Sequence, residues 1–61
     1  MPNLTSKEAT ALEEQLTSEQ LLVKKYRAAA ATVNDTAIKT KFEQIAGRHQ
    51  GHYDKLVTFI H

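Results

Sequence analysis

The sequence predicts an all-α protein, an antiparallel two-helix hairpin that pairs with a second copy to form a four-helix bundle. Three observations predict this fold. Residues that favour helix, such as Ala, Leu, Glu, Gln and Lys, fill both halves of the 61-residue chain. Apolar residues recur at alternating steps of three and four in each half, which is typical of helices packed along a seam. One strong turn signal, Asn34-Asp35, separates the halves.

The first helix is expected from about residue 6 to residue 33. Thr5 and Glu8 are spaced as a capping box at its start. Leu22 and Ala29 widen its apolar stripe, which fits four helices around a common axis better than a two-stranded coiled coil. The seam itself consists of Leu12, Leu16, Glu19, Val23, Tyr26, Ala30 and Val33.

The second helix is expected from about residue 36 to residue 60, after a turn at residues 34–35. Asp35 is a good N-cap for it, and so short a turn makes the two helices antiparallel. Gly47 and Gly51 fall on its outer face, where each costs about 1 kcal/mol relative to alanine. They are either tolerated surface positions or places where another helix approaches closely or the helix is distorted. The predicted seam is Ile38, Phe42, Ile45, His49, His52, Leu56 and Phe59.

The size of the chain favours self-association. Residues 1–61 make one small domain, near the lower limit at which a single hydrophobic core is stable. The chain has no cysteine, so neither a disulfide nor a thiolate metal site can compensate. We therefore expect a homodimer, and the alternative is a weakly stable monomeric hairpin.

Charge and hydropathy argue against several classes of function. The net charge is only +1 and basic residues alternate with acidic ones, so we expect no nucleic-acid binding. No apolar stretch is long enough for a membrane span, and no signal or lipidation motif is present, so we expect no membrane association and an intracellular protein. No nucleophile is paired with a base and no glycine-rich phosphate loop occurs, so we expect no catalytic residues.

Three ionisable residues interrupt the apolar seams: Glu19, His49 and His52. If the chain folds back between Asn34 and Asp35, Glu19 lies level with Gln50, because both are fifteen positions from the turn. The two histidines are three residues apart and so share one helix face. The sequence therefore predicts that all three meet in one layer of the interior.

This layer is either a metal site or a metal-free polar layer. One glutamate with two histidines forms some catalytic zinc sites and non-haem iron(II) sites, so a divalent transition metal (Zn, Fe, Cu or Ni) is the expected cofactor. In the alternative, Glu19 accepts hydrogen bonds from the imidazoles and fixes the helix register. Tyr26 either donates its hydroxyl toward this site as a supporting group or simply fills core.

These residues resemble half of a ferritin-like, rubrerythrin-type domain. Glu19 is followed by Tyr26 seven residues later, and the histidine pair lies within residues 43–53. The resemblance implies a four-helix bundle in which Glu19 matches the first-helix carboxylate and His52 the histidine of a Glu-x-x-His motif. His49 stands where that motif has glutamate. Fewer carboxylates stabilise Fe(III) poorly, so we expect Zn(II), Cu(II), Ni(II) or Fe(II) and no ferroxidase or oxidase activity.

The whole chain, from about Leu4 to Phe59, also resembles small spore-coat (coat F-like) proteins of endospore-forming Firmicutes. The likeness lies in residues 18–26 and 45–53. It implies a non-catalytic structural or interaction protein of the spore or its coat, with other coat proteins as partners. The alternatives are a metal-binding bundle for storage, buffering or a redox step, and a helical docking module that accepts a partner helix.

Overall fold

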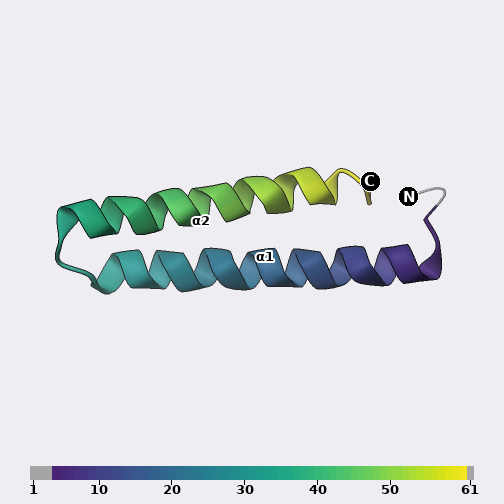
Figure 1. Ribbon diagram of the computed structural model, residues 1–61, viewed down its shortest axis with the longest axis horizontal. Coiled ribbons are helices and arrows are strands. Elements are labelled where there is room, and N and C mark those ends of the chain that lie inside the picture. Colours follow the sequence, from purple (N-terminus) through teal and green to yellow (C-terminus); the bar gives the residue numbers. More distant parts are fainter. Residues whose placement is uncertain (1–3, 61) are drawn as a thin grey trace.

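The chain forms a hairpin of two antiparallel helices in the computed structural model, which describes residues 4–60 (Figure 1). Helix α1 spans Ser6–Thr32 and helix α2 spans Thr36–Val57, with no strand in the described range. They lie side by side as a rod of 47 × 14 × 11 Å. The predicted all-α hairpin is confirmed. Neither helix is long and apolar enough to cross a membrane, as judged over the described residues.

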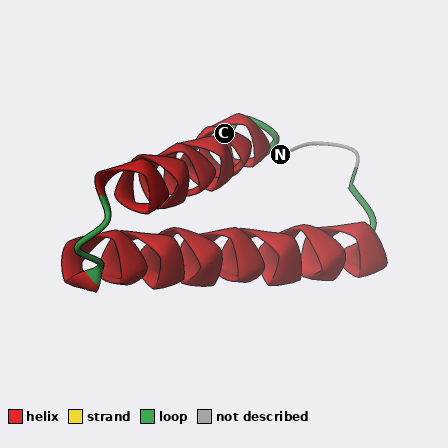
Figure 2. Ribbon diagram, turned by 60° about the vertical axis from the view of Figure 1, so that its left-hand side comes forward, coloured by secondary structure: helices red, strands yellow, loops and turns green. Residues whose placement is uncertain are grey.

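Capping interactions at both helix starts fix the ends of the hairpin. The Thr5 hydroxyl accepts a hydrogen bond from the Glu8 backbone N–H (3.1 Å), and the Glu8 carboxylate accepts one from the Thr5 N–H (3.0 Å), which completes the predicted capping box. The Asp35 carboxylate accepts a hydrogen bond from the Ile38 N–H at 2.9 Å and caps α2. Residues 33–35 form the only loop between the helices (Figure 2).

Helix α2 ends at Val57, three residues before the expected end. Residues 58–60 continue as turns with backbone hydrogen bonds to the third preceding carbonyl, such as Thr58 N–H to Lys55 O at 3.2 Å. The Thr58 hydroxyl donates to the same carbonyl at 2.6 Å, and such local side-chain bonds compete with helix continuation. Residues 1–3 and 61 of the predicted domain lie outside the described part of the chain.

The interior of the hairpin is thin. Among residues 4–60, the buried apolar residues are Val23, Ala30 and Ala46, and Glu19 is the buried polar residue, with 6% of its surface exposed. Tyr26 packs on Phe42 with ring centroids 5.8 Å apart, and this pair lies about two turns closer to the loop than Glu19. Small alanines and one carboxylate fill much of the helix interface, so the hairpin buries little apolar surface for its length.

The inward face of α2 is rotated relative to the predicted seam. Three residues expected in the core are exposed: Ile38 (46%), Phe59 (56%) and His52. Ala46 is buried instead, and Tyr53 is half-buried. With only one neighbouring helix to contact, α2 turns one narrow stripe toward α1. A row with seven-residue spacing is left at the margin, and we call it the edge row: Ile38, Ile45, His52 and Phe59.

Gly47 and Gly51 lie on the exposed side of a continuous α2. A Cβ atom built on either glycine meets no heavy atom within 4 Å. Within one hairpin, therefore, neither close approach nor helix distortion accounts for these two residues.

Candidate metal centre

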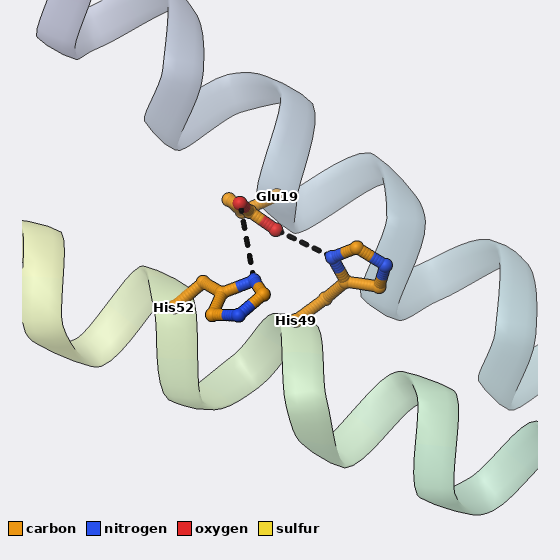
Figure 3. A group of neighbouring side chains, drawn as sticks. All are labelled: Glu19, His49 and His52. Atoms are coloured by element: carbon orange, nitrogen blue, oxygen red, sulfur yellow. Dashed lines mark hydrogen bonds and ion pairs between the residues drawn. The ribbon is translucent and has the colours of Figure 1, made fainter.

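Glu19 lies at the centre of the hairpin and contacts His49 across the helix interface. Its Oε1 atom is 2.6 Å from His49 Nδ1 (Figure 3). An ionised carboxylate can only accept hydrogen bonds, so the imidazole donates through Nδ1. The two residues are thirty positions apart in sequence, and the turn at residues 33–35 brings them to the same level.

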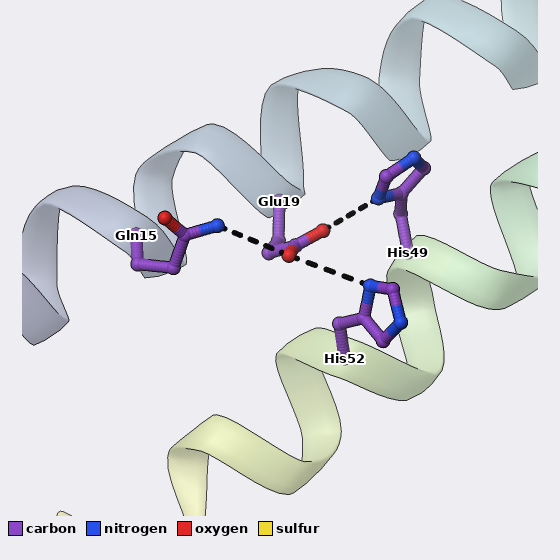
Figure 4. A network of polar contacts seen from close by, with 4 residues as sticks. All are labelled: Gln15, Glu19, His49 and His52. Carbon is purple, nitrogen blue, oxygen red and sulfur yellow. Dashed lines mark hydrogen bonds and ion pairs between the residues drawn. The ribbon is translucent and has the colours of Figure 1, made fainter.

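The second carboxylate oxygen of Glu19 faces His52 and Gln15. His52 Nδ1 lies 3.5 Å from Oε2, and the Gln15 side-chain amide donates to the same oxygen at 3.1 Å (Figure 4). The His52 side chain is 54% exposed, whereas that of His49 is 24% exposed. The three predicted ligands therefore meet, but His52 lies at the edge of the helix interface rather than inside it.

The surroundings of Glu19 favour its ionised form. The hydrogen bond from His49 lowers the pKa of the Glu19 carboxyl most, and burial acts in the opposite direction. The Gln15 hydrogen bond and the charges of both imidazoles lower this pKa further. The net direction is below the ordinary value of 4.5, so the Glu19 carboxylate is ionised at neutral pH.

The arrangement of donor atoms suits one small divalent ion. One ligand atom from each of Glu19, His49 and His52 lies within 4.8 Å of the other two. Ligand atoms of a tetrahedral ion bound at about 2.0–2.2 Å are roughly 3.3–3.6 Å apart. The His52–Glu19 distance of 3.5 Å already matches this value. The His49–Glu19 distance of 2.6 Å has to open by less than about 1 Å.

Tyr26 contacts the site through its ring. The Tyr26 and His49 rings are stacked, with an interplanar angle of 12° and centroids 6.4 Å apart. The His49 and His52 rings meet edge to face at 5.5 Å. Lys25 places its ammonium group 5.4 Å from the centroid of the Tyr26 ring. Tyr26 therefore limits the orientations that His49 can adopt through its ring, whereas the two roles considered from the sequence were donation of its hydroxyl and simple filling of the core.

One contact of the site, and one contact between the helices beside it, were not predicted from the sequence. Gln15 contacts Glu19 from one helical turn earlier, and its position outside the seam conceals this role. On the opposite side of the hairpin, the Gln20 amide donates to the Tyr53 hydroxyl at 3.3 Å and links the two helices. The i, i+4 spacing of Gln15 and Glu19 is the one signal that could have identified the first contact.

No protein-family model, curated protein or solved structure matches this chain. The resemblance to ferritin-like and spore-coat proteins therefore stays a prediction from the residues quoted for it.

Proposed function

We propose that this protein is a small non-catalytic helical protein that binds one divalent transition metal ion per chain through Glu19, His49 and His52. The observation that supports this most directly is a buried carboxylate with one imidazole Nδ1 atom at each of its two oxygens, at 2.6 and 3.5 Å. One carboxylate with two imidazoles suits Zn(II), Cu(II), Ni(II) or Fe(II) better than Fe(III).

A metal-free polar layer accounts for the contact of His49 with Glu19 more fully than for that of His52. His49 makes a short hydrogen bond with Glu19, which such a layer explains. His52 faces the same carboxylate at 3.5 Å, beyond the usual hydrogen-bond range of about 2.7–3.2 Å. A metal ion bound between Glu19 and His52 would explain both why the His52 imidazole points at the carboxylate and why the two groups lie 3.5 Å apart.

Metal content of the full chain, purified without a histidine tag, tests this proposal. We expect close to one equivalent of zinc after dialysis against a zinc buffer, and loss of at least nine-tenths of it in Glu19→Gln and in His49→Ala/His52→Ala. Glu43→Gln is the matched control, because it removes an exposed carboxylate elsewhere and should retain the metal. Equal zinc in all four proteins would overturn the proposal.

We also propose that two hairpins pair into a four-helix bundle. The support is the thin interior: three small or medium apolar residues are buried in the part of the chain that the structure describes, while Ile38 and Phe59 expose about half of their surfaces. A 61-residue chain with so small a core generally needs association to be stable.

A structural role in the spore or its coat is the setting that we propose for this activity, on the resemblance carried by residues 18–26 and 45–53. A fluorescent fusion expressed in a sporulating host should concentrate in the spore. Uniform signal in vegetative cells and none in spores would contradict this setting while leaving metal binding unaffected.

A further inference from the structure

We infer that the metal centre opens onto the surface through which a second copy of the chain docks, so that metal binding and pairing strengthen each other. This inference rests on the proposed metal binding and adds the partner and the regulation of that site. Four observations support it: the position of the site, the polarity of the two sides of the hairpin, the surface area of the chain and the charge of Glu19.

The metal centre opens to the side of the hairpin on which Gln15 and His52 lie. A groove on that side reaches Glu19 and is lined by Gln15, Glu19, His52, Lys55, Leu56 and Phe59. Leu22 and Ala29 follow Gln15 at seven-residue steps along α1, so they lie on the same side. Together with the edge row of α2, these residues form what we call the open face: Gln15, Leu22, Ala29, Ile38, Ile45, His52 and Phe59. Five of its seven residues are apolar.

The other side of the hairpin is polar and its side chains pair with one another. The Gln20–Tyr53 hydrogen bond spans the two helices there, and Gln50 donates to Asp54 at 2.9 Å. The groove on this side is lined largely by amide and basic groups: Gln20, Val23, Lys24, Arg27, Gln50 and Tyr53. A partner that buries apolar surface therefore docks on the open face.

The surface area of the chain indicates a second copy as the partner. The hairpin exposes 4673 Å². A compact monomer of its mass, 6.9 kDa, exposes about 4,000 Å². The excess of roughly 700 Å² is close to the 800 Å² or so that each partner buries in a standard interface. The residues of the open face recur every seven positions along each helix, which is the repeat with which helices of a second copy would pack against them.

Pairing through the open face couples to the metal through electrostatics. It covers the exposed part of His52 and removes the remaining access of water to the Glu19 carboxylate. Burying an anion without a compensating cation is costly, and a bound divalent ion compensates for it. Because linkage is reciprocal, the factor by which metal tightens pairing equals the factor by which pairing tightens metal binding.

Sedimentation equilibrium of the full chain with zinc and with EDTA tests the coupling. We expect zinc to tighten the dimer dissociation constant at least tenfold. Ile45→Glu, at the centre of the open face, should be monomeric and should bind zinc at least tenfold more weakly in competition titrations. Leu21→Gln is the control, because Leu21 is 61% exposed, lies outside the open face and should change neither constant. If Ile45→Glu does not fold, Ile38→Gln/Phe59→Gln replaces two exposed residues of the same face.

The outcomes separate this inference from the proposed function. A dimer that forms equally well with zinc and with EDTA, while zinc still binds, overturns the coupling and leaves the metal site intact. A chain that binds zinc as a monomer at all concentrations overturns the docking surface. A chain that binds no zinc fails the proposed function and the coupling together, whether or not it dimerises.

Discussion

Tyr26 and His49 lie with their rings within 12° of parallel and their centroids 6.4 Å apart, so an aromatic ring from α1 backs the imidazole that hydrogen bonds to Glu19. If the ring rather than the hydroxyl supports the site, Tyr26→Phe should bind zinc within about twofold of the native protein. Tyr26→Ala removes the support and should weaken zinc binding several-fold. Competition titration with a zinc indicator measures both constants.

The pair Tyr26→Phe and Tyr26→Ala carries its own control for folding. Both variants lose the hydroxyl, but only the second loses the contact with Phe42, so circular dichroism should report reduced stability only for Tyr26→Ala. Weaker zinc binding in Tyr26→Phe would instead establish a role for the hydroxyl.

The ionised Glu19 carboxylate should stabilise the hairpin in a pH-dependent manner. Hydrogen bonding to His49 lowers the pKa of Glu19 in the folded chain, so the folded state favours the ionised form more than the unfolded state does. This contribution is present above the ordinary glutamate pKa of 4.5 and is lost as the pH falls through the lowered folded value. In metal-free buffer the melting temperature of the native chain should therefore decrease on acidification from pH 6 to pH 3.

Comparison with Glu19→Gln isolates this contribution, because the amide cannot ionise. The difference in melting temperature between the two proteins should shrink toward zero as the pH falls below 4.5. Glu8 also has a lowered pKa, caused by its hydrogen bonds with Thr5, so Glu8→Gln is measured alongside. A difference that stays constant across this range would mean that the carboxylate is not stabilised by its contacts.

The capping box at Thr5 should contribute to stability without affecting the site. Thr5→Ala removes the acceptor for the Glu8 N–H and should lower the free energy of unfolding by about 1 kcal/mol. Faster amide hydrogen exchange should be confined to the first turn of α1, and zinc affinity should not change, because Glu19 lies fourteen residues away. Unchanged exchange in that turn would show that the cap is dispensable.

The register of the two helices, meaning which residues of α1 lie level with which residues of α2, could be predicted from the sequence because the chain has one strong interior turn signal. Asn34-Asp35 fixes where the helices reverse, and equal counting from that point places Glu19 between His49 and His52, as the structure shows. The Thr5–Glu8 and Asp35 caps were predictable for a similar reason, because each depends on residues within one turn of the helix.

The rotation of α2 could not be predicted in the same way. Ile38 and Phe59 have the hydrophobicity of core residues, and the sequence pattern does not distinguish burial inside one hairpin from burial between two. Ala46 is small enough to lie against α1 but carries too little hydrophobic signal to be identified as core. Gln15 was missed because a polar residue beside the seam has no periodicity of its own.

Gly47 and Gly51 give a test of how closely a second hairpin approaches. In one hairpin a Cβ at either position meets only open space, so Gly47→Ala and Gly51→Ala should each stabilise the helix by up to about 1 kcal/mol. Urea unfolding at low protein concentration, where the monomer dominates, measures this gain. Repeating it at high concentration, where the dimer dominates, should give the same gain, because pairing through the open face leaves these glycines in solvent. A gain at low concentration that becomes a loss at high concentration would place them against the second copy and move the docking surface away from the edge row.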